Sequence, residues 1–208
     1  LRVALLPTIG PYLLPLVAPR IRKKLPRVEL LLYEYQTGPM LEHLQAGDID
    51  MGILALPVPV DGLAERTLFD EPFVVAVPAD HALGSRKSLR TSDLDGETLL
   101  LLEDGHCLRD QALDVCSHSK MQEKQDFRAT SLETLRQMVA SGSGITLLPQ
   151  LASTGAYGHA RGVAIVPFAK PAPVRHVGAL WRKTSAKQQA IEAVCDVIAE
   201  AAGKTVAP

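Results

Sequence analysis

The sequence lacks a surplus of basic residues, a long apolar run and a dense set of cysteines. Lys and Arg total 22 against 23 acidic residues, for a formal net charge of −1, whereas a nucleic-acid-binding domain gathers basic residues on one face for the phosphates. This balance argues against direct binding of nucleic acid or of a membrane surface. No apolar run approaches the length of a membrane span, and three cysteines in 208 residues do not form the disulfide framework of a small secreted protein.

The start of the chain carries no basic stretch followed by an apolar run, which argues against a signal peptide. The chain opens on a strand-like run at 1–6 without an initiator Met. We therefore expect a fragment of a larger, cytoplasmic protein. Its 47% apolar content is ample for a core that needs no disulfide.

Short β-branched or leucine-rich runs alternate with helical patterns, which predicts an α/β fold with mainly parallel strands. Strands are expected at 1–6, 28–35, 51–56, 63–69, 73–77, 98–102, 127–130, 145–148, 163–168 and 174–181. Helices are expected at 11–25, 39–45, 132–140 and 186–202. Pro19 should kink or delay the first helix, and Gly47 should cap the second. Thr130 and Glu133 have capping-box spacing at the start of the third.

The order of these elements predicts two lobes. One is expected to comprise residues 1–76 with 174–208, and the other residues 77–173. Two connections between the lobes would create a hinge and a cleft, which is a common place for ligand sites.

Four stretches of the sequence form long, specific motifs. The most specific is EDGHCLRDQA at 103–112, with Cys116 after it. The others are PTIGPYLLP at 7–15, LFDEP at 68–72, and FRATSLETLR at 127–136 with GSGITLLP at 142–149. These stretches resemble the LysR-type transcriptional regulators, and in particular their peroxide-responsive members, and the resemblance covers nearly the whole chain.

The resemblance implies two Rossmann-like lobes of the periplasmic-binding-protein type II kind, in homodimers that join into homotetramers. It implies that DNA is bound only by an N-terminal winged helix-turn-helix domain, absent from this chain. The whole protein would be a cytoplasmic transcription activator that responds to hydrogen peroxide, works with RNA polymerase and is reset by a thiol reductant. No cofactor, metal or membrane contact is expected.

The resemblance identifies Cys107 as the thiol that peroxide oxidises and Cys116 as its disulfide partner. Peroxide reacts with a thiolate to give a sulfenic acid, which a second thiol converts to a disulfide. Asp104 and Gly105 are expected to begin a helix. The positive end of its dipole would lower the pKa of Cys107.

Residues expected to bind peroxide or to activate the thiolate are Thr8, Thr37, His106, Arg109, Asp110 and Arg175. The family implies peroxide-binding roles for the two threonines and His106, and an anchoring role for Arg175 in the reduced form. His106 and Arg109 are also donors close to Cys107 in sequence. Thr8 and Thr37 each precede an expected helix, so capping those helices is an alternative role for them.

The spacing of nine residues between Cys107 and Cys116 adds a physical expectation. On one helix their α-carbons would lie roughly 13–14 Å apart, at 1.5 Å rise per residue. A disulfide needs about 4.4–6.8 Å. The bond therefore requires most of the segment to unwind, so the segment would switch between two local folds.

Three other readings of these features remain open. A domain of this fold could instead bind a small metabolite in its cleft, or the chain could be a thiol peroxidase. An enzyme is not expected, because the chain lacks a redox motif such as Cys-x-x-Cys. His106, Cys107, Cys116 and His118 could offer four metal ligands, but they lack the close pairing of structural zinc sites. Cys195 shares the closing helix with apolar residues and is expected in the core.

Overall fold

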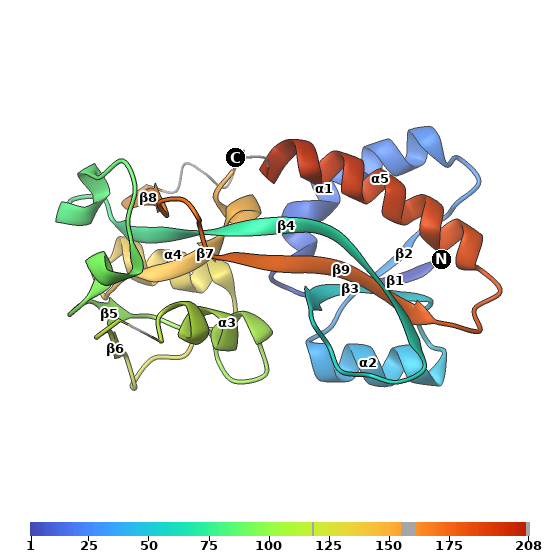
Figure 1. Cartoon of the computed structure of the whole chain (residues 1–208), viewed down its shortest axis with the longest axis horizontal. Coiled ribbons are helices and arrows are strands. Elements are labelled where there is room, and N and C mark those ends of the chain that lie inside the picture. The colour runs from blue at the N-terminus through green and yellow to red at the C-terminus, as the bar shows by residue number, and fades with distance from the viewer. Residues whose placement is uncertain (118, 155–160, 207–208) are drawn as a thin grey trace. The chain divides into compact units, whose positions relative to one another are not determined.

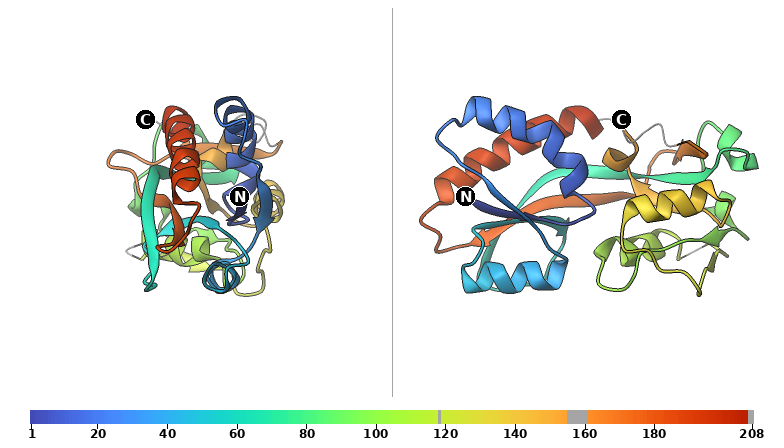
Figure 2. Two further views of the ribbon diagram at one scale, coloured as in Figure 1. Left: turned by 90° about the vertical axis from the view of Figure 1, so that its right-hand side faces the viewer. Right: turned by 180° about the vertical axis from the view of Figure 1, so that it is seen from behind.

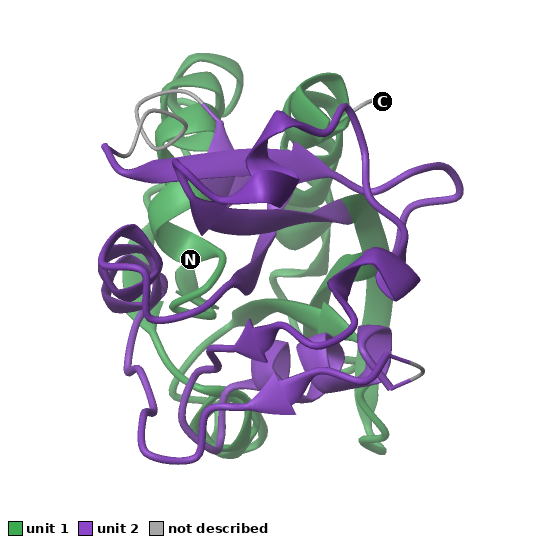
Figure 3. Ribbon diagram, turned by 90° about the vertical axis from the view of Figure 1, so that its left-hand side faces the viewer, with its two compact units in different colours: residues 1–71, 175–208 green, residues 72–174 purple. Residues whose placement is uncertain are grey.

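The chain divides into two compact units. Its structure, a computed structural model, describes residues 1–117, 119–154 and 161–206. Unit 1 comprises Leu1–Glu71 with Arg175–Pro208, and unit 2 comprises Pro72–Val174 (Figure 3). The chain therefore passes between the units twice, after Glu71 and before Arg175.

Unit 1 is a mixed β-sheet with helices on both faces. In chain order it holds β1 (Arg2–Leu5), α1 (Gly10–Lys24), β2 (Leu31–Glu34), α2 (Thr37–Ala46), β3 (Met51–Leu56), the first part of β4 (Leu63–Pro78), nearly all of β9 (Val174–Arg182) and α5 (Gln188–Val206). The strand order is β2-β1-β3-β9-β4. β1 runs parallel to β2 and β3, and β9 runs antiparallel to β3. α1 and α5 pack against each other on one face of this sheet, and α2 lies on the other (Figures 1 and 2).

α1 forms because one of its faces is apolar, in spite of three prolines. The side chains of Leu13, Val17 and Ile21 are buried at helical spacing. The helix runs unbroken through Pro15 and Pro19, so Pro19 does not delay it, and the kink predicted at Pro19 stays a prediction. Both prolines are exposed on the opposite side. The hydrogen bonds that they remove therefore lie on the solvent face, while the buried face holds the helix in place.

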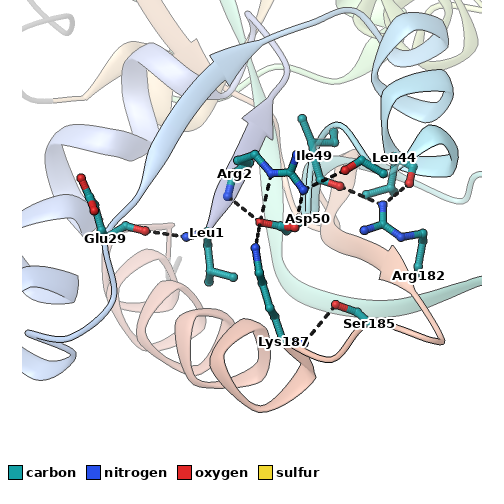
Figure 4. Close-up of polar contacts among 10 residues, drawn as sticks. Leu1, Arg2, Glu29, Leu44, Ile49, Asp50, Arg182, Ser185 and Lys187 are labelled. Carbon is teal, nitrogen blue, oxygen red and sulfur yellow. Dashed lines mark hydrogen bonds and ion pairs between the residues drawn. The ribbon is translucent and has the colours of Figure 1, made fainter.

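Asp50, which lies just before β3, links the start of β1 to the loop before α5 (Figure 4). Its side chain is 3% exposed, and it accepts hydrogen bonds from the backbone N of Arg2 at 2.9 Å, from Arg2 Nη2 at 2.9 Å and from Lys187 Nζ at 2.8 Å. Burial acts to raise the pKa of Asp50, but the bonds from Arg2 and Lys187 outweigh it and hold that pKa far below the usual range. The carboxylate thus ties β1 and the loop before α5 to the start of β3.

Unit 2 is built around the second part of β4. It adds η1 (Ala82–Ser85), η2 (Thr91–Leu94), β5 (Thr98–Leu99), α3 (Cys107–Val115), β6 (Gln122–Glu123), α4 (Leu132–Ala140), β7 (Thr146–Pro149), η3 (Gln150–Ser153) and β8 (Val163–Pro167). β4 pairs antiparallel with β7 and with β8, and β5 pairs parallel with β6. The four leucines at 99–102 are all at most 2% exposed and belong to the core of unit 2.

The predicted α/β class is confirmed, although the sheet is mixed instead of mainly parallel. The predicted break between strands at 63–69 and 73–77 is wrong, because β4 is one continuous strand. Its pairing with β7 begins at Phe73 and its pairing with β8 at Val74. Pro72, which has no N–H to donate, therefore lies where the strand changes partners.

Two further predictions need correction in unit 2. The strand expected at 127–130 is reduced to a single bridge between Ala129 and Leu102. α4 has the predicted bounds, but its cap is Ser131, which accepts a hydrogen bond from Thr134 N, and not Thr130. The lobe boundaries predicted at 76 and 173 lie a few residues from those of the two units. The hinge and cleft between lobes stay predictions.

Candidate functional site

α3 carries two of the three cysteines, one at each end. Cys107 is its first residue and is half-buried, whereas Cys116 caps its C-terminus and is 6% exposed. Neither is in a disulfide. At 1.5 Å per residue their α-carbons lie roughly 13–14 Å apart, well beyond the reach of a disulfide. The bond can form only if α3 unwinds.

The start of α3 differs slightly from the prediction. The helix begins at Cys107 with His106 as its N-cap, instead of at Asp104 and Gly105, which form the turn before it. Gly105 has a φ of 92°, a backbone conformation that favours glycine. Cys107 consequently occupies the first turn, where backbone N–H groups have no helical acceptor and the dipole favours an anion.

The ionisable side chains in and next to α3 differ in how burial shifts their pKa. Burial raises the pKa of Cys116 to about 11, so its thiol is protonated at neutral pH. Burial also lowers the pKa of His106, outweighing the opposite effect of Glu103 at 3.8 Å. His106 is therefore a neutral hydrogen-bonding group near Cys107 in sequence, and not a cation. Cys195 lies in the core of unit 1 as predicted, and burial raises its pKa to about 11.

Arg109, predicted to activate the thiolate, is bound to two carboxylates. Its Nε donates to Asp104 Oδ1 at 2.8 Å and its Nη1 to Glu123 Oε1 at 2.7 Å. Asp110, one turn after Cys107, is exposed. Sequence reasoning missed Glu123 because the segment around it is polar and shows neither strand nor helix periodicity. The charge of Arg109 stabilises α3 against β6.

A second group of predicted residues forms a buried cluster in unit 1. Arg175 donates through Nε and Nη2 to Glu71 Oε2 at 2.9 and 2.8 Å, and through Nη1 and Nη2 to Thr8 Oγ1 at 3.3 Å and Thr8 O at 3.0 Å. These three residues are 0–3% exposed. Glu71 was missed because Asp70-Glu71-Pro72 resembled a turn. The sequence signal that could have identified Glu71 is a carboxylate between two apolar runs.

The capping role considered for Thr8 and Thr37 is wrong. The N-caps of α1 and α2 are Ile9 and Gln36, and neither helix has a side-chain capping bond. Thr37 is instead the first residue of α2, and its hydroxyl is buried with no hydrogen-bond partner among the described residues. An unpaired buried hydroxyl of this kind requires an explanation.

The structure therefore brings Thr8 and Arg175 together in unit 1, and places Cys107, Arg109, Asp110 and Cys116 along α3 in unit 2. His118 lies outside the described residues. Within the described ranges, no three His, Cys, Asp or Glu residues are grouped so that they could hold a metal ion. No helix in that part of the chain is long and apolar enough to cross a membrane.

The family model of the LysR substrate binding domain matches residues 1–203. A hydrogen peroxide-inducible genes activator from Pectobacterium carotovorum is 45% identical over 200 residues; the match covers 96% of this chain and 66% of the relative. Among solved structures, a hydrogen-peroxide-bound mutant of OxyR from Corynebacterium glutamicum has a TM-score of 0.92 at 34% identity, over all of this chain and 66% of that one. The oxidised and reduced forms of OxyR have TM-scores of 0.85 and 0.86 at 44% and 43% identity, each over 96% of this chain and 94% of theirs.

Proposed function

Because the chain belongs to the LysR substrate binding domain family, we propose that it is the peroxide-sensing regulatory domain of a transcription activator. In this proposal the Cys107 thiolate attacks hydrogen peroxide, giving a sulfenic acid and water after protonation of the leaving oxygen. The Cys116 thiol then displaces the hydroxyl of that sulfenic acid, which leaves as a second water, and a disulfide forms. A thiol reductant later returns both cysteines to thiols.

The position of the two thiols at opposite ends of α3 carries the proposal. Cys107 is half-buried in the first turn, where an anion is stabilised. Cys116 is buried and protonated. This asymmetry supports Cys107 as the thiol that peroxide attacks and Cys116 as the thiol that closes the disulfide. The length of α3 makes that closure a refolding event, which is how a chemical change at one sulfur could alter an interface.

The remaining predicted residues take supporting roles in the proposal. A peroxide-binding role is proposed for each of Thr8, Thr37, His106 and Asp110 separately, and an anchoring role in the reduced form for Arg175. The unpaired hydroxyl of Thr37 supports a role in binding a small polar molecule. The chain spans about 66% of the length of the curated relative from Pectobacterium. DNA binding through an N-terminal domain, homotetramer assembly and contact with RNA polymerase are therefore proposed for the longer protein.

The experiment that tests the proposal is peptide mapping of the purified chain after a stoichiometric dose of hydrogen peroxide. Alkylation before and after reduction should identify a Cys107–Cys116 crosslink and leave Cys195 as a thiol. Two unmodified thiols at 107 and 116 would refute the proposal. Cys107→Ser should abolish the peroxide response, whereas a metabolite-binding domain would keep its response to its ligand. Repeated consumption of peroxide with a reductant would indicate a peroxidase instead.

A further inference from the structure

α3 is weakly anchored by apolar contacts. It buries the side chains of Leu108 and Ala112, whereas α4, also nine residues long, buries Leu132, Leu135 and Val139 together with Arg136. Isolated helices shorter than about 12–15 residues are marginal in water. Something other than its apolar face must therefore contribute to holding residues 107–116 helical.

Ion pairs at Glu123 contribute the additional stability that α3 needs to stay helical. The Glu123 cluster, defined as Asp104, Arg109, Glu123 and Arg128, centres on one oxygen, because Glu123 Oε1 lies 2.7 Å from both Arg109 Nη1 and Arg128 Nη2. The side chains of Arg109 and Glu123 are 12% and 20% exposed. Ion pairs that are mostly shielded from water are screened less than surface pairs.

Glu123 itself is fixed to the core of unit 2. It lies on β6, where it pairs with Leu99 of β5, and Lys124 N donates to Leu99 O at 3.0 Å. Leu99 is 2% exposed. Arg128 is held separately, because its Nη1 donates to the carbonyls of Lys124 and Phe127 at 2.7 and 2.9 Å. Of the two arginines that meet at Glu123 Oε1, Arg109 lies in the segment that must unwind and Arg128 lies outside it.

We infer that Glu123 is a positioning residue of the redox switch, which stabilises the dithiol form by holding Arg109 in α3 and so sets how readily the disulfide forms. The inference rests on the proposed function. Arg109 is two residues from Cys107, so unwinding 107–116 moves its guanidinium away from Glu123. The Arg109–Glu123 ion pair is lost in the disulfide form, whereas the contacts of Glu123 with β5 and with Arg128 do not depend on α3. Glu123 therefore favours the dithiol over the disulfide.

The test compares the dithiol–disulfide equilibrium of the 208-residue chain with that of Glu123→Gln. Each protein is equilibrated in glutathione buffers of graded redox ratio, quenched with acid and mapped for the Cys107–Cys116 disulfide. Glu123→Gln should shift the equilibrium about tenfold toward the disulfide, which corresponds to a midpoint potential about 30 mV more negative. The rate at which Cys107 is first oxidised by peroxide should change far less, because Glu123 does not take part in that step.

Glu133→Gln is the matched control. Glu133 also pairs with an arginine of unit 2, Arg136 Nε at 3.4 Å, but on α4 and outside 107–116. The same substitution there should change the dithiol–disulfide equilibrium constant by less than about twofold relative to the unsubstituted chain. An unshifted or more positive midpoint in Glu123→Gln, or an equal shift in Glu133→Gln, would overturn the role of Glu123. Absence of the disulfide from the unsubstituted chain would instead overturn the proposed function.

Discussion

At the scale of single residues, burial separates the reactivity of the three cysteines. Because burial raises the pKa of Cys116 and Cys195 to about 11, each is about 0.1% thiolate at pH 8, against about a quarter for an ordinary thiol. We expect iodoacetamide at that pH to modify Cys107 at least tenfold faster than the other two, as measured by mass spectrometry of timed samples. In denaturing urea the three rates should converge. Equal rates for Cys107 and Cys116 in the folded chain would contradict this assignment.

Asp50 shows the opposite case, a buried acid whose charged form is favoured. Asp50→Asn should lower the free energy of unfolding by about 1.5–3 kcal/mol at neutral pH, since Arg2 and Lys187 lose the charged hydrogen-bond acceptor that they share. The folded pKa of Asp50 lies below its unfolded value. Its stabilisation is thus present above about pH 4 and lost as the pH falls further. Urea midpoints at about pH 7 and about pH 3 measure this, and the two proteins should differ less at the lower pH.

At the scale of elements, the residue that caps α4 differs from the one predicted from the sequence. Ser131 Oγ accepts the hydrogen bond from Thr134 N that caps the helix, and Thr130 is exposed outside it. Ser131→Ala should therefore cost about 1 kcal/mol of stability. Thr130→Ala should change it by no more than about 0.5 kcal/mol. Urea unfolding of both variants checks this, and the reverse order would restore the cap predicted from sequence.

The elements also show how far sequence reasoning reaches. α4 and Gly47 were predicted correctly because helix periodicity and a C-terminal glycine act locally. The continuity of β4 through Pro72 depends on which strands pair with it, and no local pattern encodes that. The same holds for the site. Cys107 and Cys116 are identified by a motif, whereas Glu71 and Glu123 become significant only through arginines 104 and 14 residues away in sequence.

At the scale of the whole molecule, the chain passes between its units at Glu71 and Arg175, and these two residues form a buried ion pair. The pair joins β4 to β9 and, through Thr8, to the loop before α1. Both members of the pair belong to unit 1. Taking two charges out of water opposes folding, and their mutual contacts offset that cost only while both are present.

Because one buried charge without its partner costs more than the intact pair, a double-mutant cycle at Arg175 and Glu71 should show strong coupling. Arg175→Met should lower the free energy of unfolding by about 3–5 kcal/mol, because it leaves the Glu71 carboxylate buried without its guanidinium. Glu71→Leu should be similarly costly. The double substitution should be less destabilising than the sum of the two by at least about 2 kcal/mol, since it leaves no unpaired charge. Urea midpoints of the four proteins measure the coupling. Strict additivity would mean that Arg175 and Glu71 act independently, and that the polar cluster of unit 1 is held mainly by the bonds of Arg175 to Thr8.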